Sequence, residues 1–456
     1  MHGASTRTPV RWARLLLTGA LVVGLTQSAA CSVRSARASS PAPRSETPVA
    51  PGSKVARLQE VDGGPRYYAK FSPSLPADPS FFPVGVWLAA VNRQSDITSD
   101  QAAGLNTYVT LTSNSDFSLV RQSGMYLIAS RASGEGSASV GWFVDDEADM
   151  WAGAGNAKWT GKRSHRGISC QPATAACGYT IQQEVLRTLP HDHRFRFANY
   201  GKGVSFWEND AQAEQFIDDY QNVVSADDYW FTDDNICAAS QGGEWYNSRL
   251  LVNGRLPTNL CHLAANYGKT VNRIRYLARY KKPVWAFVEL GHPYPENNWP
   301  SIQPQQVIGA VWQSLIAGAR GIIFFNHSFG GPCVTDNVLR DQCYASIRAV
   351  VTQVDREIHS LAPVLNAPFA DGVVTASSGV NFSTKWYHHH FYILAGSKNP
   401  SAQNVTFSMP CAGSTAVTVL NERRTIQAPD GTFTDHFDNG DAIHIYRIDG
   451  GSSCGA

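Results

Sequence analysis

The sequence has almost no net charge, since 38 Lys and Arg oppose 37 Asp and Glu and leave +1 with His neutral. A chain without a basic excess cannot neutralise many phosphates, so nucleic acid is excluded as the main partner. No phosphate-cradling glycine loop and no Ser-His-Asp pattern stands out. The cysteines include no CxxC pair, so zinc or redox chemistry is not predicted for them. These absences leave chemistry carried by carboxylates, amides and aromatic rings.

Long hydrophobic runs are also scarce. The apolar stretch Leu15 to Leu25 is only eleven residues long, too short to span a bilayer. It follows a basic start and precedes the small residues 28–30, which together predict a signal peptide over residues 1–30. Cys31 comes next. Two interpretations remain open: ordinary cleavage, or a lipoprotein in which Cys31 is acylated and becomes the mature N-terminus.

Residues 31–54 are rich in Ser, Ala, Pro and Arg and predict a flexible tether, because they offer little to bury. Beyond the tether, the cysteines are even in number. Nine occur in all, and setting Cys31 aside leaves eight, which suits disulfides in an exported chain. Nearest-neighbour pairing predicts Cys170–Cys177, Cys237–Cys261, Cys333–Cys343 and Cys411–Cys454.

Short apolar runs recur from Phe81 onward. They are continuous, as in strands covered on both faces of a parallel sheet. They fall at residues 81–88, 106–111, 125–130, 140–144, 195–200, 228–232, 283–290 and 321–326.

Helical spacing of apolar residues fills several of the intervals between these runs. It occurs at residues 180–189, 210–226, 260–280 and 304–319, and again at 342–361. Eight strands separated by helices predict a (β/α)8 TIM barrel over residues 55–364. The interval 131–139 is short for a parallel crossover and indicates a vestigial helix or a misplaced strand boundary.

The pattern changes after Leu365. Alternating short runs such as "NVTFSM" and "TAVTVL", separated by turns, predict a small antiparallel β-sandwich over residues 365–456. The tract His388-His389-His390 is not predicted to bind metal, because alternate faces of a strand would split the three side chains.

Two glutamates end predicted barrel strands, where barrels place their active sites. Glu147 ends "GWFVDDE", and Glu289 ends the otherwise uncharged run "PVWAFVEL". Cleaving a glycosidic bond needs one protonated and one ionised carboxyl group, about 5 Å apart in retaining enzymes. Strands four and seven face each other across the mouth, so we predict Glu289 as nucleophile and Glu147 as acid/base. Burial and the Glu289 charge would raise the Glu147 pKa, and His292 or a tyrosine would keep Glu289 ionised.

These two strands resemble the catalytic strands of clan A glycoside hydrolases, the 4/7 barrel superfamily. The stretches "GARGIIFFNH" and "VLNERRTIQAPDGTFTDHFDNGDAIHIYRI" resemble that group's eighth strand and its C-terminal β-sandwich. The resemblance implies an acid/base at Glu147 and a nucleophile at Glu289. It departs at Asp146, where the group usually has Asn, and so leaves the substrate contact in question.

Six further polar or aromatic residues near strand ends are candidates for contacting substrate. They are Trp87, Asp146, Tyr200, Asp233, His292 and Asn326. Each has a plainer interpretation as core or loop packing, and Asp145, Asp146 and Asp149 would equally suit caps of the following helix or loop.

The leading hypothesis is a secreted, monomeric glycoside hydrolase that acts without cofactor or metal on an extracellular poly- or oligosaccharide, with the membrane reached only through a lipid on Cys31. A second hypothesis is a surface-anchored glycan-binding protein that has lost turnover. A third is a metal-assisted hydrolase that uses Asp145, Asp146, Asp233 and Asp234.

Overall fold

Eight parallel strands close into a barrel in the computed structural model, which describes residues 55–130, 135–243, 248–449 and 454. The strands follow one another around the barrel in chain order, and the last pairs with the first. They are β2 (Val84–Ala89), β3 (Thr107–Leu111), β4 (Tyr126–Ala129), β5 (Gly141–Asp146), β8 (Phe195–Tyr200), β9 (Val223–Ala226), β10 (Val284–Glu289) and β11 (Ile322–Phe325). The predicted (β/α)8 barrel is therefore confirmed.

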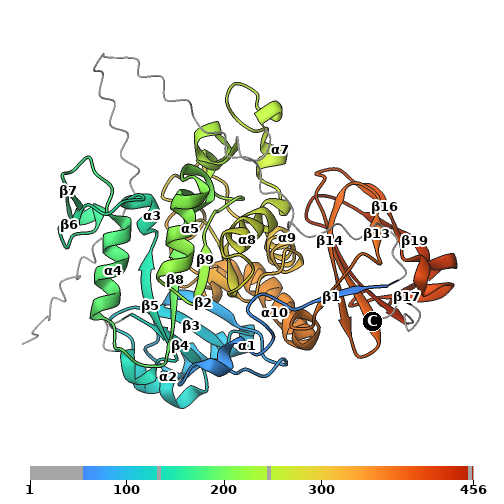
Figure 1. Ribbon diagram of the computed structural model, residues 1–456, viewed down its shortest axis with the longest axis horizontal. Coiled ribbons are helices and arrows are strands. Elements are labelled where there is room, and N and C mark those ends of the chain that lie inside the picture. Colours follow the sequence, from blue (N-terminus) through green and yellow to red (C-terminus); the bar gives the residue numbers. More distant parts are fainter. Residues whose placement is uncertain (1–54, 131–134, 244–247, 450–453, 455–456) are drawn as a thin grey trace, which may run out of the picture.

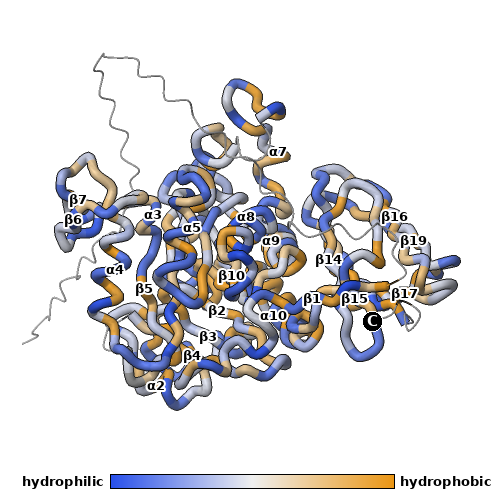
Figure 2. Tube along the Cα trace, in the orientation of Figure 1, coloured by the Kyte–Doolittle hydropathy of each residue, from blue (hydrophilic) through white to orange (hydrophobic). Residues whose placement is uncertain are grey.

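Both faces of the barrel strands are buried, which explains their continuous hydrophobicity. On β10, Trp285 and Phe287 belong to the cluster that fills the barrel interior. Val284 and Val288, on the opposite face of the same strand, pack outward with the surrounding helices. Figure 2 shows hydrophobic stretches along the strands and helices of the barrel and hydrophilic stretches in many of its peripheral loops.

The helices surround the barrel (Figure 1). They are α1 (Gln94–Ala103), α2 (Phe117–Ser123), α3 (Ala148–Trp151), α4 (Gly178–Thr188), α5 (Asp210–Asp219), α7 (Thr258–Cys261), α8 (Ala265–Leu277), α9 (Pro304–Ile316) and α10 (Ala345–Leu365). None of the described helices has the length and apolar character needed to cross a membrane. In the described part of the short interval between the third and fourth strands, the chain forms the 3-10 helix η3 (Glu135–Ala138), which agrees with a vestigial helix there.

The prediction for the sixth strand is wrong. The strand is β9, and the predicted run 228–232 is a loop that follows it. The helix predicted at 210–226 is correspondingly too long, because α5 ends at Asp219. The loop is apolar because its aromatic residues are buried: Trp230 is fully buried, and Tyr229 packs against the interior cluster.

The C-terminal part consists of antiparallel sheets, as predicted. Its strands are β12 (Phe369–Asp371), β13 (Thr375–Ala376), β14 (Val380–Tyr387), β15 (His390–Ser397), β16 (Gln403–Ser408), β17 (Thr415–Val419), β18 (Arg424–Ala428), β19 (Thr432–Phe437) and β20 (Ile443–Asp449). Residues 57–59, predicted to belong to the barrel, instead form β1 (Arg57–Gln59), which pairs with β12 and joins the seven-stranded sheet. This part lies beside α9, whose Gln313 donates to the Ser397 carbonyl at 2.6 Å (Figure 1).

The four predicted disulfides are all present, with the predicted pairing. One of them, Cys170–Cys177, closes an excursion between β5 and α4 that carries the two-stranded hairpin β6 (Lys158–Trp159) and β7 (Cys170–Gln171). The predicted signal peptide, tether and Cys31 lie outside the described residues.

Candidate active site

The carboxyl ends of β5, β8, β9 and β10 supply the polar groups at one end of the barrel. Side chains alternate along a strand, so Glu289 continues the inward face that Trp285 and Phe287 occupy on β10. Asn199 continues the inward face of β8 in the same way. A register shift in β5 after Phe143 brings Asp146 opposite Asn199. A polar layer therefore caps the aromatic interior of the barrel.

Glu289 is fully buried and surrounded by hydrogen-bond donors. The Tyr267 hydroxyl, from α8, donates to its carboxylate and lies 2.5 and 2.6 Å from the two oxygens. The Phe231 backbone N–H donates at 3.1 Å, and the Thr232 hydroxyl lies at 3.4 Å. Burial raises the pKa of Glu289 to about 7, against the effect of these donors, which lower it. The donors thus favour the ionised form of a carboxyl group that burial alone would keep protonated.

Glu147 lies in a different environment. It follows β5 in the left-handed backbone conformation, with φ of 54°, which is uncommon for a residue with a side chain and often marks a functional position. Its side chain is half-buried. Burial raises the pKa of Glu147 well above its ordinary value, and the charges of Asp146 and Asp149 raise it further, while Lys202 lowers it.

Gly201, at the end of β8, permits the close packing around Glu147. A Cβ atom at this position would clash with the Met150 sulfur and lie 3.3 Å from the Glu147 carboxylate. The Gly201 N–H donates to Asp149 at 3.1 Å, and the Val204 N–H donates to the same carboxylate at 2.9 Å. Asp149 therefore anchors the loop after β8 instead of capping its own helix.

The charges of Glu147 and Glu289 affect the pKa values of the same two tyrosines, Tyr229 and Tyr294. Burial raises the pKa values of Tyr229 and Tyr294 most, and the charges of Asp227, Glu147 and Glu289 raise both further. Glu289 is the last residue of β10 and Glu147 directly follows β5, so both residues lie at the carboxyl end of the barrel. Tyr229 and Tyr294 are 6.2 Å apart between ring centres, and Trp299 packs on Tyr294 at 4.7 Å.

The structure adds Asp227 to the carboxyl cluster, a residue that the sequence analysis missed. It directly follows β9. Burial raises its pKa well above the ordinary value, and Glu147 and Asp146 raise it further. Asn199 donates to Asp146 at 3.0 Å and accepts a 2.6 Å bond from the Ser225 hydroxyl. Hydrogen bonding to Asn199 also lowers the pKa of Asp227, so this amide links the two aspartates. The misplaced sixth strand concealed its terminal acid.

The other predicted substrate-binding residues lie in several different environments. Trp87 is 7% exposed and packs in the barrel interior against Phe143 and Phe287. Tyr200 is fully buried and donates to the Phe216 carbonyl at 2.8 Å, on the α5 side of β8.

His292 and Asn326 organise loops. The His292 ring nitrogens lie 2.9 Å from the Ser301 hydroxyl and 3.0 Å from the Glu296 carbonyl, so the group beside Glu289 is Tyr267 and not His292. The Asn326 side chain accepts the Leu339 N–H at 2.9 Å.

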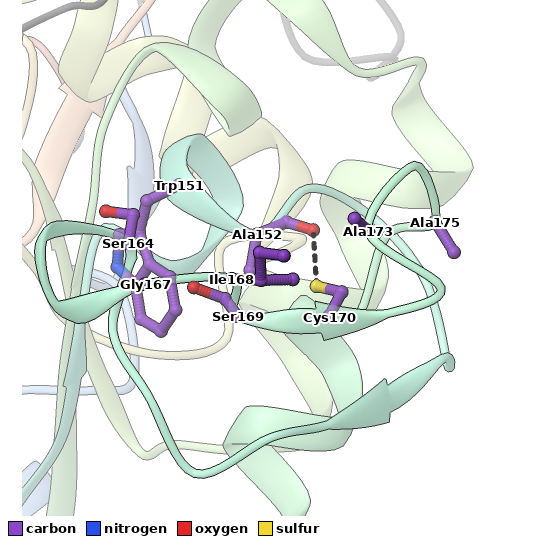
Figure 3. Close-up of a pocket in the computed structure, with 9 residues that line it drawn as sticks. All are labelled: Trp151, Ala152, Ser164, Gly167, Ile168, Ser169, Cys170, Ala173 and Ala175. Atoms are coloured by element: carbon purple, nitrogen blue, oxygen red, sulfur yellow. Dashed lines mark hydrogen bonds between the residues drawn. The ribbon is translucent and has the colours of Figure 1, made fainter.

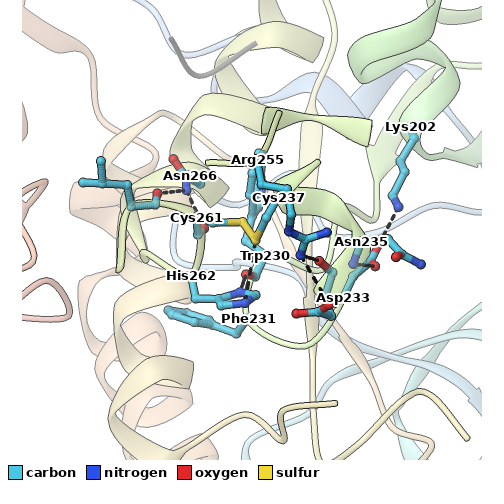
Figure 4. The surroundings of a disulfide bond; sticks show 12 residues. Lys202, Trp230, Phe231, Asp233, Asn235, Cys237, Arg255, Cys261, His262 and Asn266 are labelled. Atoms are coloured by element: carbon cyan, nitrogen blue, oxygen red, sulfur yellow. Dashed lines mark hydrogen bonds and ion pairs between the residues drawn. A yellow bond between two sulfur atoms is a disulfide. The ribbon is translucent and has the colours of Figure 1, made fainter. Parts of the chain in front are cut away.

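Asp233 lies in the loop after β9, beside the Cys237–Cys261 disulfide, and forms a 2.5 Å ion pair with Lys202 (Figure 4). Asp145 pairs with Arg163 at 2.5 Å, and Asp234 with Arg255 at 3.3 Å. Three of the four acids of the metal-assisted hypothesis thus have cationic partners.

Comparison with known proteins gives only distant similarities. No family model matches the chain, and no curated protein does. A structure described as a glycoside hydrolase is 10% identical, with a TM-score of 0.49 over 89% of this chain and 99% of that one. A family 5 glycoside hydrolase from Bacteroides vulgatus is 9% identical, with a TM-score of 0.47 over 82% and 90%. An α-amylase from Geobacillus thermoleovorans is 8% identical, with a TM-score of 0.46 over 81% and 98%. Similarities this distant assign no family.

Proposed function

We propose that the protein is a secreted glycoside hydrolase that cleaves an extracellular poly- or oligosaccharide by a retaining, two-carboxylate mechanism. The observation that carries this proposal is the contrast between two glutamates at one end of the barrel. Donors around Glu289 favour its ionised form, whereas burial and neighbouring acids raise the pKa of Glu147 and favour its protonated form. A pair of carboxyl groups with separated environments is what glycoside cleavage requires.

The reaction would run in two steps. The Glu289 carboxylate attacks the anomeric carbon while the bond from that carbon to the leaving oxygen breaks, and Glu147 gives its proton to that oxygen. Glu147 then removes a proton from water, whose oxygen displaces Glu289 from the anomeric carbon. Tyr267 would hold the Glu289 carboxylate in position and stabilise its charge.

Activity against aryl glycosides and cell-wall glycans tests the proposal. We expect Glu289→Gln and Glu147→Gln each to remove nearly all turnover, and the first product to keep the anomeric configuration of the substrate. Glu184→Gln, on the partly exposed surface of α4, is the matched control and should keep full activity. Full turnover by Glu289→Gln would refute the assignment. Binding of a glycan without any product would favour a glycan-binding protein instead.

We also propose export, with residues 1–30 as signal peptide and residues 31–54 as tether. Four disulfides support an oxidising compartment. The mass of the mature N-terminus distinguishes simple cleavage from acylation of Cys31, and sedimentation tests the expected monomer.

A further inference from the structure

A pocket of about 200 Å³ lies between α3, the helix that follows the proposed acid/base, and the hairpin excursion that comes after it (Figure 3). Trp151 and Ala152 form the α3 side. Ser164, Ile168 and Ser169 are among the residues that form the excursion side. None of the roles proposed above uses this pocket.

The pocket is built on a braced segment. The Cys170–Cys177 disulfide fastens the excursion at its base. The Thr160 N–H donates to the Ser169 carbonyl at 2.8 Å across the hairpin, and the ion pair of Arg163 with buried Asp145 ties the outer part to the barrel. A wall held at three points is preorganised for a ligand, because little ordering is left for the binding step.

Its chemistry combines an aromatic face with an unsatisfied hydroxyl group. The Trp151 indole N–H donates to the Asp146 carbonyl at 2.8 Å, which fixes the orientation of the ring. The Ser169 hydroxyl has no hydrogen-bond partner among the described residues although Ser169 is only 7% exposed. Ile168, at the rim, is 63% exposed. A buried polar group without a partner is costly, and a bound hydroxyl would satisfy it.

The pocket borders the short helix that begins after Glu147. The Trp151 backbone N–H donates to the Glu147 carbonyl at 3.1 Å. The Arg163 guanidinium lies 5.4 Å from the centre of the Trp151 ring. The charges of Asp145, Asp146 and Glu147 all raise the pKa of Arg163, so this guanidinium lies near both the pocket and the carboxyl cluster.

We propose that this pocket binds the sugar unit on the leaving-group side of the scissile bond, with the Trp151 ring against the sugar face and Ser169 bonded to a sugar hydroxyl. The proposal rests on the function proposed above: the acid/base protonates the leaving oxygen, so the unit attached to that oxygen lies on the Glu147 side. The substrate would then be an oligo- or polysaccharide with a sugar as its leaving group.

Calorimetric titration of Glu289→Gln with cello-, xylo-, malto- and chitooligosaccharides measures this binding. We expect Trp151→Ala, added to that variant, to weaken binding about tenfold, the loss of one ring contact. Ser164→Trp, from an exposed rim position, should fill the pocket and weaken binding at least as much. Trp159→Ala is the matched control: this half-buried indole belongs to the same hairpin and bonds the Lys162 carbonyl at 3.0 Å, but it does not line the pocket.

A kinetic comparison separates this proposal from the proposed function. Ser164→Trp should lower kcat/KM for the oligosaccharide about tenfold and leave hydrolysis of the matching glycosyl fluoride unchanged, because fluoride occupies no sugar subsite. Trp151→Ala should lower kcat/KM by a larger factor for the oligosaccharide than for the fluoride. Unchanged oligosaccharide binding in both variants, equal losses on both substrates, or no binding by any of the four series would overturn the pocket assignment. Full turnover by Glu289→Gln would instead overturn the catalytic assignment.

Discussion

Tyr267→Phe removes one hydroxyl group from a fully buried position and should move the pKa of Glu289. The Tyr267 oxygen lies 2.5 and 2.6 Å from the two carboxylate oxygens, the short distance expected of a hydrogen bond to a charged acceptor. Such a bond stabilises the charged form by about 1.5–3 kcal/mol. At about 1.4 kcal/mol per pKa unit, its loss raises the pKa of Glu289 by about 1–2 units.

The starting value decides how this shift appears in the kinetics. With a pKa of about 7, Glu289 is about half ionised at neutral pH, and the substitution leaves about a tenth to a hundredth ionised. If ionised Glu289 is the nucleophile, the acid limb of the profile of kcat/KM against pH should move to higher pH by about 1–2 units. The rate at pH 6 should fall about ten- to a hundredfold, while the ratio of the two enzymes approaches one at higher pH.

The assay is the pH profile of kcat/KM on one aryl glycoside, for the parent and the variant. Tyr276→Phe, on the same helix and half-buried, is the matched control and should leave the profile unchanged. An acid limb that stays in place, or a loss of equal size at every pH, would refute the role given to the Tyr267–Glu289 bond.

Three further predictions concern stability. The folded-state pKa of Glu289 is raised from 4.5 to about 7, so its contribution to the free energy of unfolding is fully present below pH 4.5 and is lost as the pH rises through 7. Between about pH 5 and 8, the free energy of unfolding from thermal melts should therefore fall by about 2.5 kcal/mol less for Glu289→Gln than for the parent. Identical curves would contradict this. Asp62→Ala removes contacts of 2.5 and 2.9 Å to buried Arg275 and should lower the free energy of unfolding by about 3–5 kcal/mol in urea denaturation. Asp371→Ala, which breaks the half-exposed 3.9 Å pair with Arg57, should lower it by less than about 1 kcal/mol. Equal losses would be inconsistent with the burial argument. Replacing Cys411 and Cys454 by Ser opens a loop of sequence separation 43 and should cost about 4 kcal/mol on the chain-entropy estimate, read as a lower Tm against the parent, and an unchanged Tm would argue against it.

The barrel was predictable because its strands need both faces buried, and continuous apolar runs record that requirement directly. Seven of the eight runs coincide with barrel strands. The disulfides were predictable because each joins cysteines that are consecutive in the chain. Closing a short loop costs little conformational entropy, so pairing between near neighbours is favoured.

The sixth strand shows where the same argument fails. The sequence "VVSA" is short and has Ser225 on the inward face, where that side chain bonds Asn199. The following run "DYWFT" is more apolar, but it is a loop whose side chains close over the barrel end and pack against α8: Trp230 donates to Thr270 at 3.0 Å, and Phe231 lies 5.4 Å from Tyr267. Periodicity reports burial and does not distinguish a short buried strand from a buried loop.

That failure also explains which parts of the candidate site sequence reasoning could find. Glu289 is the last residue of the apolar strand β10 and Glu147 directly follows β5, so their positions follow from local pattern alone. Asp227 is also a strand-end residue, but it became recognisable only when β9 was placed correctly. Tyr267 carries no local signal at all, since it is one aromatic residue on a helix, and its contact with Glu289 depends on how α8 packs against β10. Catalytic candidates at strand ends can be recognised from short segments of sequence. The groups that set their pKa values cannot, because they are brought close only when the helices and strands pack together.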